Sequence, residues 1–458
     1  MNRLLLLLAV SALAWRPAGA QDTLTVGLGE ALSRALEVSP DILAEQAGLQ
    51  FAEGRLGHAR ASRLLTDAGA TTAHAFAPAL DNPNSTATDR LYLDPDVRND
   101  WERLHPFSRL DVDVIQPLWT WGQIGRSIDA ARAGVELEQA AVQESQYVVV
   151  ERTGELYFSM LLLNVLDRLA SEAGDAVSRA KEEVEKQLEA GSADVGDADL
   201  FQVLITEQEV RKRVARVREE MATARSGLTR QLMLPPGIAL ETEDRYLEPL
   251  GFQLDALEVY EQLALRHRPE VAQAQAGVEA REALVDVARS DYFPKLFLGA
   301  HMHYSGTTAD RFRQRNPYVG DSFLSRSLEA GLGMRLQLNF RQTRARVEQA
   351  RANLAEVQHL ETGARELVLF EVEQAWRAVR IRQEELAAAE EAFRLSREWL
   401  LTEYNNFELE LGDTDDLIKA VQAKLELEAG RHQAVFDLNM AILRLHTSSG
   451  LLEPLLAY

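Results

Sequence analysis

Apolar residues recur every seven positions over two stretches of the chain that contain no proline, residues 118–234 and 318–453. The first stretch carries nine such residues in register: Ile128, Val135, Val142, Val149, Leu156, Leu163, Ala170, Val177 and Val184. The second carries a shorter series: Val372, Val379, Leu386, Phe393 and Leu400. A seven-residue period held this long is typical of long helices that supercoil against their neighbours. We predict a long and a returning helix in each stretch, over residues 123–190 and 197–233, and over residues 341–411 and 416–448.

Four other segments alternate apolar and polar residues, a period of two that is typical of β-strands. They are residues 68–77, which are weakly patterned, 109–119, 295–304 and 327–340. The last segment alternates most clearly, and we predict that it presents to lipid an apolar face made by Leu328, Leu332, Met334, Leu336 and Leu338. A half-buried hairpin of a soluble protein would alternate in the same way and is the other interpretation.

Aromatic residues cluster where the predicted strands begin or end. They are Trp119, Trp121, Tyr292, Phe293 and Phe340. Aromatic side chains are enriched at the boundary between lipid and water. We therefore predict that these five residues mark a membrane interface.

The chain contains a duplication. Pro40–Ile42 reads Pro-Asp-Ile, and Pro269–Val271 reads Pro-Glu-Val 229 positions later. The same offset relates Gln46–Gly48 to Gln275–Gly277, both Gln-Ala-Gly. The chain thus divides into a signal peptide at 1–20, a first half at 21–235, a connector at 236–253 and a second half at 254–458. Each half is predicted to be a helix, a strand, a loop, a strand, a long helix and a returning helix.

Four strands are too few to close a barrel, because single-chain bacterial barrels begin at about eight strands. If the strands lie in a membrane, several copies of the chain must each contribute four of them. The sequence therefore predicts an obligate oligomer.

The N-terminus has the pattern of an export signal. Arg3 precedes an apolar run, Leu4–Trp15, and Ala18–Ala20 reads Ala-Gly-Ala, a small-residue cleavage site before Gln21. No later stretch is apolar enough for a spanning helix, so any contact with the membrane interior must come through strands. The net charge of -22 disfavours nucleic acid as a partner. The absence of cysteine excludes disulfides, thiolate metal sites, cysteine nucleophiles and a lipid-modified N-terminal cysteine.

Motifs for catalysis are absent from the sequence. It has no P-loop, no H-E-x-x-H and no G-x-S-x-G, so we expect neither enzymatic activity nor a cofactor. His301 and His303 lie two apart on one strand face and could hold a metal ion, but the sequence shows no third ligand. We therefore expect no metal site and interpret both histidines as polar residues of a lumen or a loop.

Two groups of aspartates lie at the turns between the long and the returning helices. They lack the glycine and the distal glutamate of a calcium-binding loop, and we interpret them as caps of the returning helices. The groups are Asp194, Asp197 and Asp199, and Asp413, Asp415 and Asp416.

In their order and spacing, several segments resemble the TolC-type outer-membrane efflux protein family, the outer-membrane factors. They are the helix starts at Pro40 and Pro269, the segment Ala288–Pro294 before a predicted strand, Gln116–Trp119 at the end of another, and the turn from Gly191 to Asp197. The resemblance extends from about Leu24 to Leu452. The first half departs from it, since Arg63–Thr66 lacks the proline that the second half has at 294.

The resemblance implies a mainly helical fold with membrane strands. In that fold a homotrimer forms a twelve-stranded outer-membrane β-barrel, which long helical hairpins continue across the periplasm as an α-barrel. It also implies a passive exit duct in a tripartite efflux or type I secretion system, with a periplasmic adaptor protein and an inner-membrane transporter as partners. The alternative function is that of a soluble periplasmic coiled-coil scaffold, which would share the heptads but not the strand alternation. An exported hydrolase has only scattered histidines and aspartates in its favour.

The resemblance assigns roles to the two turns farthest from the barrel. Gly191, Asp197, Gly412 and Asp416 would contact the adaptor, although the second turn is about two residues shorter than the first. Repeated around a trimer, Asp413, Asp415 and Asp416 would form an acidic ring at the narrow end, which favours cations over anions.

Overall fold

A computed structural model describes residues 23–64, 67–81, 98–190, 196–309, 311, 321–409 and 414–456. The predicted signal peptide lies outside these residues. The chain divides into two compact units, the first made of Met1–Gln46, Ala140–Val271 and Ala364–Tyr458, and the second of Ala47–Gln139 and Ala272–Gly363. Each unit draws on both halves of the duplication. The halves are therefore not separate compact units, because their strands share one sheet.

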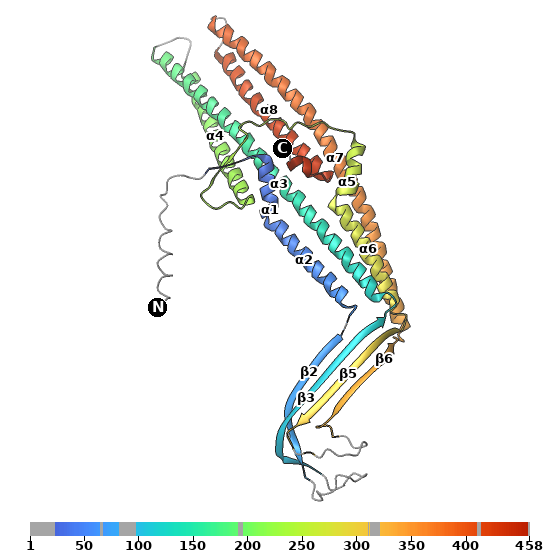
Figure 1. The fold of residues 1–458 in the computed structure, drawn as a ribbon. Coiled ribbons are helices and arrows are strands. Elements are labelled where there is room, and N and C mark those ends of the chain that lie inside the picture. The colour runs from blue at the N-terminus through green and yellow to red at the C-terminus, as the bar shows by residue number, and fades with distance from the viewer. Residues whose placement is uncertain are drawn as a thin grey trace, which may run out of the picture. The chain divides into compact units, whose positions relative to one another are not determined.

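The second unit contains a four-stranded antiparallel sheet (Figure 1). Its strands are β2 (Asp67–Asp81), β3 (Arg98–Trp119), β5 (Lys295–Thr307) and β6 (Arg326–Arg335), in the order β2-β3-β5-β6. The central pair, β3 and β5, joins the first half of the chain to the second. Strands β2 and β3 extend beyond their predicted ends because they pair with each other there, with Asp81 opposite Arg98.

The strand predicted over residues 327–340 ends at Arg335, which lies opposite Lys295, the first residue of β5. Beyond that point β5 supplies no partner for pairing, although the alternation of the sequence continues. Leu336 and Leu338 lie between β6 and the next helix, and Phe340 is the first residue of that helix. The prediction that these three residues belong to the strand was wrong, because alternation does not report whether a neighbouring strand is present.

The long helices are α3 (Gln123–Glu189) and α7 (Phe340–Glu408), and the returning helices are α4 (Asp197–Gln231) and α8 (Thr414–Ser448). Their ends lie within three residues of the predicted ones. The shorter helices are α1 (Leu28–Val38), α2 (Pro40–Ala61), α5 (Leu257–His267), α6 (Pro269–Ser290) and α9 (Glu453–Leu456). The sequence did not predict α1 or α5, each of which precedes a helix that opens at a duplicated proline.

Proline explains where these paired helices break. Ser39, between α1 and α2, has φ -60° and ψ 122°, and Arg268, between α5 and α6, has φ -68° and ψ 127°. Both residues precede proline, whose ring disfavours the helical conformation in the residue before it. Each break therefore follows from the local sequence and recurs in both halves.

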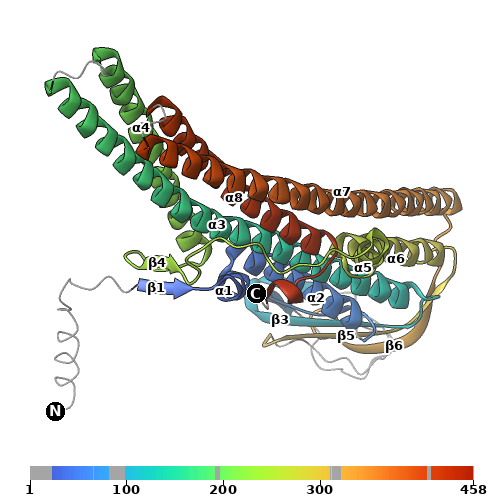
Figure 2. The ribbon, with the colours of Figure 1, turned by 90° about the horizontal axis from the view of Figure 1, so that it is seen from above.

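The first unit also contains a small parallel sheet, in which β1 (Thr23–Val26) pairs with β4 (Ala239–Thr242) (Figure 2). Its core collects apolar side chains from several helices, among them the fully buried Leu32, Leu228 and Ile442. Burial of each such side chain contributes about 1.5–3 kcal/mol. The core thus ties together segments from both halves.

A buried histidine in this core makes folding sensitive to pH. His446 on α8 is only 6% exposed and packs edge-on against Phe252, with ring centroids 5.3 Å apart. Neither ring nitrogen finds a hydrogen-bond partner among the described residues. Burial away from water disfavours the charged form and lowers the pKa of His446.

We predict that the protein loses stability as the pH falls below about 6.5, the ordinary pKa of histidine in an unfolded chain. In that range His446 binds a proton in the unfolded state but stays neutral in the folded state. The free energy of unfolding therefore falls by up to about 1.4 kcal/mol per pH unit for this residue. Urea denaturation between pH 8 and pH 5 measures the slope. His446→Leu should flatten it, and an equally steep slope in the variant would assign the sensitivity to other groups.

Candidate functional site

One face of the four-stranded sheet is apolar and exposed. On β6, Leu328, Leu332 and Met334 are 76%, 79% and 66% exposed. The register places apolar residues of β5 opposite them: Met302, Leu298 and Leu296. An exposed apolar surface of this kind marks contact with another protein or with lipid.

The other face of the sheet is polar. Asp111 on β3 lies opposite His303 on β5, and Asp113 lies opposite His301. His303 Nδ1 is 2.6 Å from Asp111 Oδ1, and His301 Nδ1 is 2.8 Å from Asp113 Oδ1. Sequence analysis found the two histidines but not their partners, which are 188 and 192 positions away. A face of hydrogen-bonded charged groups is suited to water and not to hydrocarbon.

Aromatic side chains pack together at the end of the sheet where β3 ends and β5 begins. The rings of Trp121 and Phe293 stack with centroids 4.8 Å apart, and Trp119 meets Trp121 edge-on at 6.1 Å. Trp121 Nε1 donates a hydrogen bond to the carbonyl of Pro294, 2.8 Å away. The structure thus brings together three of the five predicted interface aromatics. Tyr292 is next to Phe293 in the chain, and Phe340 is exposed at the start of α7.

An arginine that sequence analysis missed ties several segments together near the opposite ends of these strands. Arg311 is 8% exposed, and its Nε donates to Asp321 Oδ2 at 2.6 Å. Its two Nη atoms donate to the carbonyl of Pro78 and to Asn99 Oδ1. A lone arginine in a polar loop carries no sequence signal for this role, because its partners come from distant parts of the chain.

The helix turns are described only in part. Gly191, Asp194, Gly412 and Asp413 lie outside the described residues, and so does the side chain of Asp415. At the first turn, Asp197 begins α4 and Asp199 Oδ2 accepts a hydrogen bond from the backbone N–H of Gly196 at 2.8 Å. At the second turn, Asp416 Oδ1 accepts a hydrogen bond from Lys419 Nζ at 3.0 Å. Asp199 therefore binds a free N–H group at a helix start, as the capping interpretation expects.

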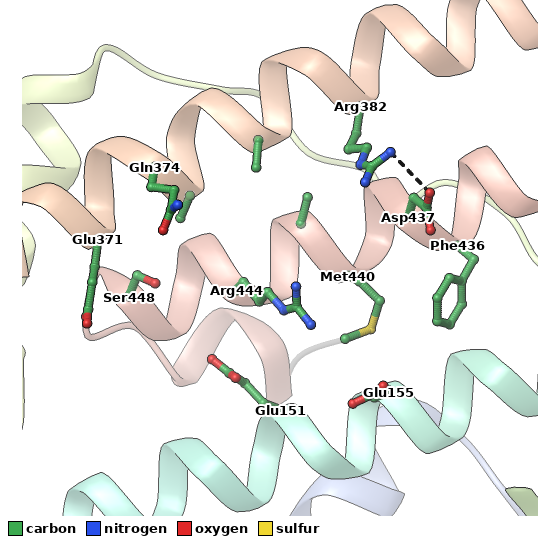
Figure 3. Close-up of a pocket in the computed structure, with 13 residues that line it drawn as sticks. Glu151, Glu155, Glu371, Gln374, Arg382, Phe436, Asp437, Met440, Arg444 and Ser448 are labelled. Carbon is green, nitrogen blue, oxygen red and sulfur yellow. Dashed lines mark ion pairs between the residues drawn. The ribbon is translucent and has the colours of Figure 1, made fainter.

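In the first unit, a groove of about 640 Å³ lies between α3, α7 and α8 (Figure 3). Glu151 and Glu155 line it from α3, and Arg444 points into it from α8. Arg382 on α7 forms an ion pair with Asp437 on α8, at 3.2 Å. The lining mixes both signs of charge, which is typical of a surface in contact with water.

Among the described residues, no helix combines the length and the apolar character needed to cross a bilayer.

Comparison with known proteins finds outer membrane efflux proteins. Residues 261–401 match the family model described as outer membrane efflux protein. The pyoverdine export outer membrane protein OpmQ of Pseudomonas aeruginosa is 26% identical over 448 residues, which cover 92% of this chain and 86% of OpmQ. Both matches support the resemblance to the outer membrane efflux protein family that the sequence analysis found.

Solved structures share the fold of this chain. The CmeC outer membrane channel of Campylobacter jejuni matches with a TM-score of 0.73 at 14% identity, over 96% of this chain and 90% of that one. The outer membrane protein VceC of Vibrio cholerae matches with a TM-score of 0.72 at 17% identity, over 92% and 96%. At such identities the likeness concerns the fold.

Three predictions made from the sequence are confirmed: the resemblance to the family, the mainly helical fold with some strands, and the location. The protein resides in the outer membrane and extends into the periplasm. The predicted roles of the tip glycines and aspartates, the interface aromatics and the lipid-facing leucines stay predictions.

Proposed function

We propose that three copies of this efflux protein assemble into a closed barrel of twelve strands, through which substrates leave the cell. The observation that carries the proposal is the open sheet of one chain, with β2 and β6 as its outer strands and an exposed apolar face. In lipid an unpaired backbone N–H or C=O group costs several kcal/mol, so sheets that span membranes close on themselves. Two chains would reach the lower limit of about eight strands, and the family resemblance favours three.

Native mass spectrometry of the detergent-solubilised protein tests the assembly, and the expected mass is that of three chains. The chain has no cysteine, so engineered thiols report contacts without background. Ala330→Cys on β6 can be combined in turn with Ala68→Cys, Ala70→Cys or Thr72→Cys on β2, and one of these pairs should form covalent trimers on oxidation. Each single variant is the matched control and should yield no covalent trimer. A protein that stays monomeric in detergent would refute the proposal.

We further propose that the duct is passive and receives its substrates from an inner-membrane pump through a periplasmic adaptor. The chain carries no nucleotide-binding motif to drive transport by itself, and its curated relative is named for export. Crosslinking in cells, followed by purification of this chain, tests for the partners. An adaptor recovered with the chain would support the tripartite arrangement, whereas transport of a substrate against its concentration gradient by vesicles that contain this protein alone would contradict it.

The acidic residues at the second turn are expected to set the ion preference of the duct. Replacing Asp413, Asp415 and Asp416 by asparagine should reduce its preference for cations, because a ring of carboxylates at a narrow opening attracts cations and repels anions. Planar-bilayer recording of reversal potentials in a salt gradient measures this preference.

The matched control removes three exposed carboxylates from α3 instead, with Glu172→Gln, Asp175→Asn and Glu182→Gln, and should change the reversal potential less. Equal ion selectivity in the tip variant and the unmodified protein would leave the three aspartates with a capping role alone.

The alternative, a soluble periplasmic coiled-coil scaffold, predicts that the protein stays in solution without detergent. The exposed leucines of β6 argue against it. Fractionation of cells into periplasmic and outer-membrane material distinguishes the two, and a chain found only in the periplasmic fraction would favour the scaffold.

A further inference from the structure

Two histidine–aspartate pairs lie side by side on the polar face of the sheet, where β3 meets β5. The pairs are His303 with Asp111 and His301 with Asp113, and neighbouring members of each strand are two residues apart. Asp111, His301 and His303 each offer one potential ligand atom, and these three atoms lie within 4.8 Å of one another. The third ligand that the sequence did not show thus comes from the neighbouring strand.

We propose that Asp111, His301 and His303 form a binding site for a divalent transition-metal ion, such as Zn²⁺ or Cu²⁺. Two imidazoles and one carboxylate are a donor set that binds such metals and leaves coordination positions for water. Metal–nitrogen and metal–oxygen bonds of about 2.0–2.2 Å allow ligand atoms up to about 4 Å apart. Side-chain rotations that close the present spacing by less than about 1 Å would satisfy this limit.

Asp113 has a positioning role in this arrangement. Its contact with His301 Nδ1 is made when that nitrogen carries the proton, which leaves Nε2 free to bind the metal. A histidine that is held by a carboxylate through one nitrogen and binds metal through the other is the common arrangement in protein metal sites. His303 differs, because its Nδ1 faces Asp111, which is itself a proposed ligand. An ion held by both residues would replace the proton between them and would bind the deprotonated Nδ1 of His303.

The charges around the site favour a cation. Glu329 of β6, which lies opposite His301, adds a third carboxylate to those of Asp111 and Asp113. The other residues that lie opposite these positions carry no charge. They are Ser327 of β6, opposite His303, and Gly69 and Thr71 of β2, opposite Asp113 and Asp111.

The main competitor for the metal is Arg109, whose Nε is 2.6 Å from Asp111 Oδ2 and whose Nη2 is 3.2 Å from Oδ1. The Arg109 side chain is 51% exposed, so it can turn into water when an ion binds the carboxylate.

All three ligands belong to one chain, so the site does not depend on the proposed trimer. A trimer that binds no metal would refute the site alone, and a monomer that binds metal would refute the trimer alone. In the proposed barrel the polar face is the lumen, and the ion would therefore lie beside the export path.

The site can be tested on the full-length protein in detergent by equilibrium dialysis against Zn²⁺. We expect one ion per chain and at least a tenfold loss of affinity in His301→Asn and in His303→Asn, with a smaller loss in Asp113→Asn. His74→Asn is the matched control, because His74 of β2 lies on the opposite face and contacts Ser108 at 3.0 Å. With Cu²⁺ as the probe, electron paramagnetic resonance should show hyperfine coupling to two nitrogens in the unmodified protein.

A second measurement needs no variant and covers the case in which a substitution prevents assembly. Zn²⁺ should protect His301 and His303 from modification by diethyl pyrocarbonate, as read by mass spectrometry of peptides, and should leave His74 reactive. Weak binding that is unchanged when both histidines are replaced, or equal modification with and without Zn²⁺, would overturn the proposal. The two pairs would then be hydrogen bonds that support the sheet and nothing more.

Discussion

Replacing Leu332 by arginine is expected to lower the free energy of unfolding of the membrane-inserted protein by about 2 to 4 kcal/mol. Leu332 lies within β6 on the apolar face and is 79% exposed in the single chain. We predict that this exposed surface meets hydrocarbon in the outer membrane, where a guanidinium loses its hydration. Urea titration of protein folded into lipid vesicles, followed by tryptophan fluorescence, measures the change.

The matched control for this substitution is Gly331→Arg, one residue earlier on the polar face. A side chain at Gly331 would enter open space, since no atom lies within 4 Å of a β-carbon built there. We expect a loss below about 1 kcal/mol for this variant, because its charge would stay in water. Equal losses of unfolding free energy in the two variants would show that the apolar face does not contact lipid while the polar face contacts water.

Gly333, two residues further on the polar face, cannot serve as this control. A β-carbon there would lie 2.5 Å from Cζ of Phe297, the residue opposite it on β5. Any substitution at Gly333 would displace the aromatic ring, so its effect would report crowding and not the polarity of the face.

Replacing Gly450 by alanine is expected to lower the free energy of unfolding by about 3 kcal/mol, from backbone strain and steric overlap together. Gly450 follows α8 with φ +76°, where Leu451 N–H donates to the carbonyl of His446 and Gly450 N–H donates to that of Thr447. This is the hydrogen-bond pattern of a Schellman motif, which places a left-handed residue after the helix. A β-carbon at Gly450 would lie 2.8 Å from the carbonyl carbon of His267, so the backbone would have to move.

Gly430→Ala is the control, because Gly430 lies inside α8 with open space around it. Alanine there should raise the stability by about 0.5 to 1 kcal/mol. Met233, which follows α4, has φ 49° and the same pair of hydrogen bonds, so Met233→Gly should be neutral or stabilising by up to about 1 kcal/mol. Urea denaturation followed by circular dichroism measures all three, and a Gly450→Ala variant as stable as the unmodified protein would contradict the strain argument.

The sequence by itself determined the elements that depend on local periodicity. A seven-residue series such as Ile128 to Val184 is compatible with a long helix and not with a strand. A series of period two, such as Leu328 to Met334, is compatible with a strand whose faces differ. Proline determined the helix starts at Pro40 and Pro269, because it acts on the residue before it. The family followed from the order and spacing of these local signals.

Only the tertiary structure decided which strands pair and therefore where they end. The alternation continues to Phe340, but β6 ends at Arg335, because pairing needs a partner and β5 begins at Lys295. The sequence showed His301 and His303 without a third ligand, and the pairing of β3 with β5 brought Asp111 beside them. Contacts across 192 positions leave no periodic trace in one sequence, because they depend on how distant segments meet in space.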